Sequence, residues 1–177
     1  ACLVGSEMCI RDSTGVTSKY IFEKLARIPV EVDLASEFRY RDPILPENTL
    51  VVIVSQSGET ADTLAALRLA KEKGVRTLGI VNVVGSSIAR EADNVMYTWA
   101  GPEIAVATTK AYSTQLIAQY LLAMKFAKVR GTVSQNDFDA MIQSLERLPE
   151  QISLLLSHKE NVQRFANRYL AAEHVFF

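Results

Sequence analysis

One stretch of sequence predicts the architecture of this chain: Leu50-Val51-Val52-Ile53-Val54-Ser55-Gln56-Ser57-Gly58-Glu59-Thr60. The apolar, mostly β-branched residues 50–54 are typical of a strand that is buried on both faces of a parallel sheet. The chain then passes through a short turn and continues in residues 61–73, whose spacing predicts an amphipathic helix closed by Gly74. A buried strand followed by a turn and a helix is the start of a βα unit, so the sequence predicts an α/β fold.

The turn after this strand is a candidate anion-binding site. A helix N-terminus presents amide N–H groups without intrahelical acceptors and carries partial positive charge, which anions favour. Ser55, Ser57 and Thr60 add hydroxyl donors at the same place. The turn lacks the Walker and dinucleotide glycine spacings, so it indicates a single phosphate, as in a phosphosugar. The alternative, that Thr60 only caps the helix and the serines only stabilise the turn, stays open.

The rest of the chain alternates predicted strands and helices, which is typical of a parallel sheet covered by helices. The predicted strands are residues 29–34, 50–54, 76–81 and 94–98. The predicted helices are residues 17–26, 61–73, a short one ending near residue 91, 109–129, 135–157 and 159–171. We therefore expect a three-layer αβα sandwich with a parallel sheet, followed by extra helices.

The later helices carry more detailed predictions. In the long helix 109–129, the apolar spacing predicts a buried stripe made of Leu116, Ile117, Tyr120, Leu121 and Met124. Pro149 is expected to divide or kink the helix 135–157, because proline cannot continue the helical hydrogen bonds. Residues 174–177 are expected to begin another strand.

Composition excludes several classes of function. The chain has 177 residues, of which 49% are apolar, and a net charge of −1 from 19 basic and 20 acidic side chains. This balance gives no reason to expect binding to nucleic acid or to an anionic membrane. No apolar run approaches the roughly 20 residues of a transmembrane helix. With only Cys2 and Cys9, no disulfide framework is expected, and a reducing, cytoplasmic location fits.

A second candidate site opens the long helix, at residues 105–110. Thr108 and Thr109 offer hydroxyls and Lys110 offers a cation, while the small residues before them leave room for a ligand. Ligands of open parallel sheets collect at the carboxyl ends of strands, so the two hydroxyl clusters could share one crevice. A capped helix with a solvated lysine is the alternative.

Other reactive side chains predict little. His158 and His174 have no Cys, Asp or Glu neighbours at metal-ligand spacing, so the sequence predicts no metal site. Glu59 could act as a general base, but a carboxylate beside a phosphate is repelled, and Glu59 is expected to face away. Arg39 and Arg41 could bind an anion or a partner chain; a surface salt-bridge cluster is the favoured interpretation.

Several separate motifs resemble one family of proteins. Residues 55–63 (SQSGETADT) are similar to the phosphate loop of the sugar isomerase (SIS) fold. Together with residues 35–41 (ASEFRYR), 100–104 (AGPEI) and 107–112 (ATTKAY), in this order and spacing, they resemble the glutamine–fructose-6-phosphate aminotransferases. The resemblance runs from about Thr14 to the end of the chain and implies a Rossmann-like SIS fold.

The resemblance implies a function and a set of site residues. Enzymes of this family carry a glutaminase domain, which supplies ammonia, and two SIS domains, which convert fructose 6-phosphate to glucosamine 6-phosphate without a metal or redox cofactor. By position, the sugar phosphate would be held by Ser55, Gln56, Ser57 and Thr60, and the sugar side of the pocket would be lined by Val106 and Thr108. The family also implies a homodimer formed through the SIS domains.

The resemblance also implies how the chain is divided. Residues 1–13 do not resemble the family and are interpreted as a leader or an assembly artefact, with Met8 to Asp12 standing where the family has an ACGTS loop. Residues 14–157 correspond to the first SIS domain, and residues 158–177 to a connecting helix and the opening strand of a second one. The family's catalytic glutamate, histidine and lysine belong to the second SIS domain, so no catalytic residue is assigned here, and Lys110 is not that lysine.

Two classes of function follow. The first is a piece of the isomerase half of an aminotransferase, which is expected to be inactive alone because proton transfer between C1 and C2 needs a base. The second is a standalone SIS module that binds or senses phosphosugars; a DNA-binding regulator would also need a basic helix-turn-helix, and none is visible. A partial fold that binds nothing is a third possibility, because the first strand departs from the family.

Overall fold

The structure is a computed structural model that describes residues 2–6, 9–104 and 109–174. The chain forms two compact units, residues 1–134 and residues 135–177. The first unit contains the sheet, and the described part of the second is helical.

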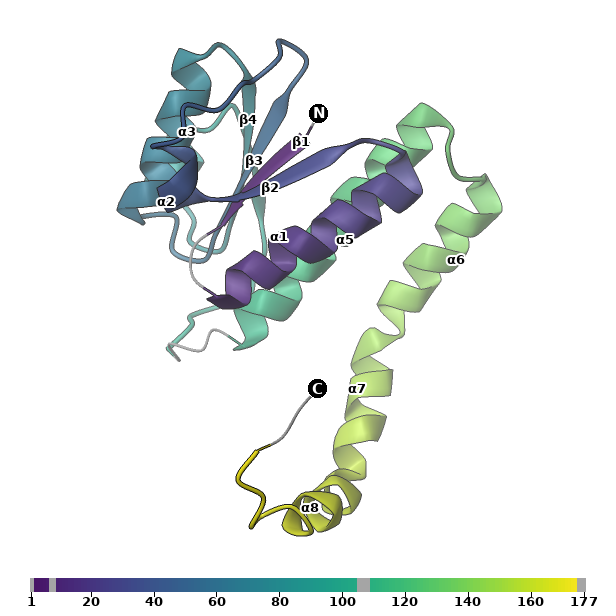
Figure 1. Ribbon diagram of the computed structural model, residues 1–177. Coiled ribbons are helices and arrows are strands. Elements are labelled where there is room, and N and C mark those ends of the chain that lie inside the picture. The colour runs from purple at the N-terminus through teal and green to yellow at the C-terminus, as the bar shows by residue number, and fades with distance from the viewer. Residues whose placement is uncertain (1, 7–8, 105–108, 175–177) are drawn as a thin grey trace. The chain divides into compact units, whose positions relative to one another are not determined.

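Five parallel strands form the sheet of the first unit (Figure 1). They are β1 (Cys2–Ser6), β2 (Val30–Leu34), β3 (Leu50–Ser55), β4 (Arg76–Val81) and β5 (Asn94–Tyr97). Their spatial order is β2-β1-β3-β4-β5, so β1 lies between β2 and β3. Because every pair is parallel, the carboxyl ends of all the strands meet at one edge of the sheet.

The N-terminal segment is part of this architecture. The sequence interpretation sets residues 1–13 apart as a leader, whereas in the structure residues 2–6 form the strand between β2 and β3. Residues 9–12 belong to the first helix, α1 (Cys9–Ile21). The helix predicted at residues 17–26 therefore starts earlier and ends in a π-helical segment, η1 (Phe22–Ala26).

Helices cover both faces of the sheet (Figure 1). One face is covered by α1, η1 and α5 (Thr109–Arg130), and the other by α2 (Ala35–Phe38), α3 (Ala61–Glu72) and α4 (Ser87–Glu91). This arrangement confirms the predicted three-layer αβα sandwich with a parallel sheet.

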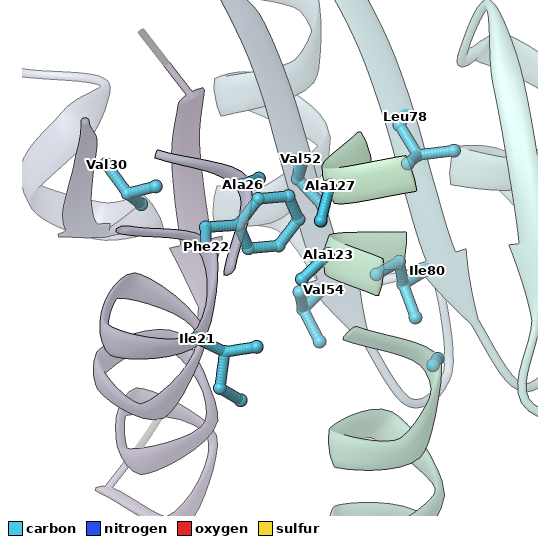
Figure 2. Close-up of a cluster of buried hydrophobic side chains, with 11 residues drawn as sticks. Ile21, Phe22, Ala26, Val30, Val52, Val54, Leu78, Ile80, Ala123 and Ala127 are labelled. Atoms are coloured by element: carbon cyan, nitrogen blue, oxygen red, sulfur yellow. The ribbon is translucent and has the colours of Figure 1, made fainter. Parts of the chain in front are cut away.

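The side chains of β3 explain why both faces are covered. Val52 and Val54 belong to the core cluster under α1, η1 and α5, whereas Val51 and Ile53 belong to the cluster under α2, α3 and α4. Successive side chains of a strand point to opposite faces, so an uninterrupted apolar strand needs a helical layer on each side. Figure 2 shows the first cluster, in which the ring of Phe22 lies among small and β-branched side chains.

The predicted buried stripe of α5 is wrong. Among its five residues only Met124 is fully buried, while Tyr120 and Leu121 are each 36% exposed. The buried face is instead formed by Ala111, Gln115, Ala118, Gln119, Ala123, Met124 and Ala127. Small side chains let α5 approach the sheet and η1 closely, since the distance between packed elements follows the size of the side chains between them. Helical periodicity alone cannot distinguish such a face from a stripe of larger apolar residues.

The second unit contains α6 (Gln135–Glu146), α7 (Leu148–Ser157) and α8 (Lys159–Asn167). Pro149 lies in the first turn of α7 and divides the long predicted helix, as expected. None of these three helices contains a buried residue. The unit boundary after Ser134 lies earlier than the domain boundary expected at residue 157. Most of the strand expected at residues 174–177 lies outside the described residues.

Candidate phosphate-binding site

The hydroxyl loop, defined here as Ser55–Thr60, lies at the switch point of the sheet. The chain runs from β1 to β2 on one side and then to β3 on the other side of β1, so the strand order reverses between β1 and β3. Connections leaving adjacent carboxyl ends at such a point diverge to opposite faces and leave a crevice between them. The hydroxyl loop joins the carboxyl end of β3 to α3 and therefore borders this position.

Hydrogen bonds inside the loop separate the roles of its hydroxyls. Ser55 is fully buried, and its Oγ accepts a hydrogen bond from the Gly58 amide at 3.1 Å. The half-buried Ser57 accepts one from the Glu59 amide at 3.3 Å. Both serines thus stabilise the turn, which is the role that the alternative interpretation of the sequence gave them. Each keeps its O–H as a donor, because an accepted hydrogen bond uses only an oxygen lone pair.

Thr60, in contrast, does not cap the helix with its side chain as that interpretation predicted. It occupies the N-cap position of α3, with φ −69° and ψ 132°, but its side chain makes no capping hydrogen bond. Its carbonyl accepts from the Leu64 amide at 3.0 Å and from the Thr63 hydroxyl at 2.9 Å, so the helix starts without the Thr60 side chain. Thr60 is half-buried at the start of α3, and its hydroxyl makes no hydrogen bond to the first-turn amides of that helix.

The loop is held against α4 by its middle residues. Gly58 has φ +69°, and a Cβ added to it would stand 2.2 Å from Ser86 Oγ and 2.7 Å from Ser86 Cβ. Its carbonyl accepts from the Ile88 amide at 3.0 Å. Only glycine combines this left-handed backbone with so close an approach, so the sequence position of Gly58 sets the contact between the loop and α4.

Glu59 fixes the same contact through its carboxylate. Its oxygens accept from the Ser87 amide at 2.8 Å and from the Ser87 hydroxyl at 2.6 Å. The Ser87 hydroxyl, followed by the Ser87 amide, holds the pKa of Glu59 below its ordinary value of 4.5. Glu59 is therefore an engaged carboxylate that faces the start of α4. That it turns away from a bound phosphate stays a prediction.

Both arginines of residues 37–41 form ion pairs with carboxylates of the chain. Arg39 Nη1 lies 2.7 Å from Asp62 in the first turn of α3, and this hydrogen bond raises the pKa of Arg39. Arg41 pairs with Asp33 and, at 2.9 Å, with Glu31. The interpretation of this segment as a surface salt-bridge cluster is confirmed. Since Asp62 stands near the hydroxyl loop in sequence, its pairing with Arg39 also reduces a negative charge that would oppose an anion there.

Only part of the second candidate cluster lies within the described residues. Val106 and Thr108 lie outside them. Thr109 is exposed at the start of α5, and Lys110 donates through Nζ to the carbonyl of Pro102 at 2.5 Å. Lys110 is therefore bound to the connection that precedes its own helix.

Sequence reasoning missed Asn82, the first residue after β4. Its amide donates to the Gln56 carbonyl at 3.1 Å, and its side chain bonds the segment after β5. The available signal was its place: a polar residue directly after a buried strand lies at the ligand edge of a parallel sheet.

Two other kinds of site receive no support. The described residues contain no group of three or more His, Cys, Asp or Glu side chains that could hold a metal ion. None of the helices in the described part of the chain has the length and apolar character to cross a membrane.

A hollow of about 460 Å³ lies at the amino ends of β4 and β5, beside Arg76 and Asn94 and away from the hydroxyl loop. Lys71, which lines it, lies 3.6 Å from Asp93.

Fold and loop together define a doubly wound α/β domain with a candidate anion loop at its switch point. The sequence profile of the SIS domain matches residues 10–125, which is more than half of the chain, and the chain belongs to the SIS domain family.

Individual relatives narrow this relationship. The chain is 58% identical over 163 residues to a glutamine–fructose-6-phosphate aminotransferase [isomerizing] of Caldanaerobacter subterraneus, covering 92% of this chain and 27% of the relative. It is also 58% identical to the protein of that name from Clostridium acetobutylicum, over 88% of this chain and 26% of the relative. The chain thus spans about a quarter of the length of these relatives.

A solved structure agrees with the sequence relatives. The C-terminal domain of glucosamine-fructose-6-phosphate aminotransferase from Francisella tularensis superposes with a TM-score of 0.88 at 36% identity. The match covers 95% of this chain and 47% of that one. This similarity agrees with the α/β architecture and with a position in the C-terminal half of such a protein.

Proposed function

We propose that this chain is part of the isomerase half of a glutamine-dependent fructose-6-phosphate aminotransferase and that its hydroxyl loop binds the phosphate of fructose 6-phosphate. The observation that carries the proposal is the position of the loop at the switch point. There the Thr60 hydroxyl, at the start of α3, makes no capping hydrogen bond. The names of the relatives supply the substrate class.

Each loop residue has a different part in this proposal. Ser57, Gln56 and Thr60 are half-buried and offer donors toward a phosphate. Ser55 is fully buried and holds the Gly58 amide, so it shapes the loop and reaches the phosphate only if its hydroxyl hydrogen turns that way. Val106 and Thr108 would line the sugar side of the pocket; both lie outside the described residues.

The whole enzyme would contain more than this chain. A glutaminase domain would supply ammonia, and a second SIS domain would supply the catalytic glutamate, histidine and lysine. The first SIS domain would correspond to residues 14–157, with residues 158–177 leading into the second. The assembly would be a cytoplasmic homodimer that acts without a metal or redox cofactor. Glucosamine 6-phosphate, an amino-sugar precursor, would be its product.

The proposal is tested by titrating the chain with fructose 6-phosphate while amide NMR shifts are followed. Shifts confined to residues 55–60 and 106–109 are expected. A charge-assisted hydrogen bond contributes about 1.5–3 kcal/mol, so Ser57→Ala and Thr60→Ala are each expected to weaken binding by about tenfold or more. Ser153→Ala, on the exposed surface of α7, is the control. Unchanged affinity in the combined Ser57→Ala, Thr60→Ala variant contradicts the proposal.

A further inference from the structure

Asn82 joins two segments that are far apart in the sequence. It follows β4 directly, is half-buried, and begins the connection to α4. On one side its backbone amide donates to the Gln56 carbonyl of the hydroxyl loop at 3.1 Å. On the other side its carboxamide bonds the connection after β5, defined here as residues 98–104.

The carboxamide of Asn82 uses both its acceptor and its donor. Oδ1 accepts from the Ala100 amide at 2.8 Å and from the Thr98 hydroxyl at 3.1 Å, and Nδ2 donates to the Gly101 carbonyl at 2.8 Å. Exchanging the oxygen and the nitrogen would set a donor against the Ala100 amide and an acceptor against a carbonyl, so only one orientation of the side chain fits. An aspartate of the same size would keep the acceptor but lose the donor to the Gly101 carbonyl.

The connection after β5 is fastened at its far end as well. The Pro102 carbonyl accepts from Lys110 Nζ, and the Glu103 carboxylate accepts from the Ala111 amide at 3.4 Å. Both donors belong to the first turn of α5. A continuous series of hydrogen bonds therefore runs from the hydroxyl loop through Asn82 and the connection after β5 to the start of α5.

The backbone between these contacts is strained. Trp99 has φ +52°, a left-handed conformation that is unfavourable for a non-glycine residue, and it is 75% exposed. Its two neighbours, Thr98 and Ala100, are both bound to Asn82. Such strain persists only where the surroundings hold it. Here they include the Asn82 side chain, the Thr98 amide bonded to the Val81 carbonyl at 3.0 Å, and the Tyr97 ring, whose centroid lies 5.7 Å from that of Trp99.

We propose that Asn82 is a positioning residue: its side chain sets the distance between the hydroxyl loop and the start of α5, so that a phosphosugar spanning both binds more tightly than phosphate alone. This inference rests on the proposed function of the hydroxyl loop. It assigns Asn82 no contact with the ligand, because its polar atoms are occupied by the chain.

The test compares inorganic phosphate with fructose 6-phosphate on the full 177-residue chain. Asn82→Ala removes the side-chain bonds but keeps the backbone amide that holds Gln56. We expect the Kd for inorganic phosphate to stay within about twofold, and the Kd for fructose 6-phosphate to rise about tenfold through the lost hydrogen bonds. Thr98→Val removes a single bond to Asn82 and is expected to raise the second Kd about threefold. Asn94→Ala, an exposed asparagine at the opposite end of β5, is the control.

Tryptophan fluorescence gives a second readout, because Trp99 is the only tryptophan of the chain. Its anisotropy is expected to fall in Asn82→Ala and to stay unchanged in Asn94→Ala. Equal weakening for both ligands, or unchanged fructose 6-phosphate affinity in Asn82→Ala and Thr98→Val, overturns the role of Asn82. If Asn82→Ala does not fold, Thr98→Val decides the question alone. If the wild-type chain binds neither ligand, the proposed function fails, and this inference fails with it.

Discussion

Gly58 illustrates how one residue can set the geometry of the candidate site. Its left-handed backbone and its contact with Ser86 are separate requirements, and Gly85 provides a comparison because it has φ +73° and nothing within 4 Å of an added Cβ. A left-handed alanine costs about 1 kcal/mol, and overpacking adds about 1–3 kcal/mol.

We therefore expect Gly58→Ala to lower the free energy of unfolding by about 3 kcal/mol and Gly85→Ala by about 1 kcal/mol. Denaturant unfolding of both variants measures the difference. Similar losses in the two variants would mean that the residues around Ser86 shift to accept the added methyl group at little cost.

Glu59 predicts a pH dependence whose sign follows from its contacts. Its pKa lies below 4.5 in the folded chain, because the Ser87 hydroxyl and amide favour the carboxylate. Its contribution to stability is therefore complete above pH 4.5 and is lost as the pH falls through the folded pKa. Glu59→Gln should be less stable than the wild type at pH 7, and the difference should shrink as the pH falls below 4.5.

Urea unfolding at a series of pH values measures this difference. Glu72→Gln, at the exposed end of α3, serves as the matched control. A stability difference for Glu59→Gln that remained constant down to pH 3 would show that the Glu59–Ser87 contact does not form in solution.

At the scale of elements, α5 shows what a periodic pattern can hide. Its buried face consists mainly of alanines, together with Gln115 and Gln119, whose carboxamides have no hydrogen-bond partner among the described residues. Larger apolar residues of the same helix, such as Leu121, lie partly exposed. Close packing against η1 and the sheet, rather than apolar character, selects this face.

Substitutions on the two faces of α5 test this packing. Ala123→Leu is expected to lower the free energy of unfolding by about 1–3 kcal/mol, because the fully buried Ala123 site has no room for a larger side chain. Leu121→Ala should cost less than about 1 kcal/mol, since Leu121 is partly exposed. Thermal or urea unfolding measures the stability of the two variants. A larger loss for Leu121→Ala than for Ala123→Leu would contradict the packing of α5 through its alanine-rich face.

At the scale of the whole molecule, the proposed site would position a ligand without supplying proton transfer. The isomerisation needs a base and an electrophilic partner for the carbonyl. Glu59 is bound to Ser87, and Lys110 is bound to Pro102. Under the proposed function, the catalytic groups would lie in a second SIS domain.

We therefore expect the 177-residue chain to form no glucosamine 6-phosphate from fructose 6-phosphate with either glutamine or ammonia. The assay is product detection by mass spectrometry over a long incubation, with a full-length relative as the positive control. Sustained turnover by the chain alone would contradict the expectation that it lacks catalytic groups.

The sequence by itself determined four of the five strands, the longer helices and the position of the hydroxyl loop. Strand β4 has the predicted limits and β3 extends one residue further, to Ser55, because an apolar run ending at a polar turn depends mainly on neighbouring residues. The resemblance carried by residues 55–63 pointed to the SIS family, to which the chain belongs.

Only the tertiary structure decided the remaining features. The place of residues 2–6 between β2 and β3, the alanine-rich buried face of α5, and the link made by Asn82 all depend on segments that are distant in the chain. Local propensity and periodicity carry no information about which distant segment approaches, or how closely. That closeness is set by packing, and it determines which side chains are buried and which polar groups find partners.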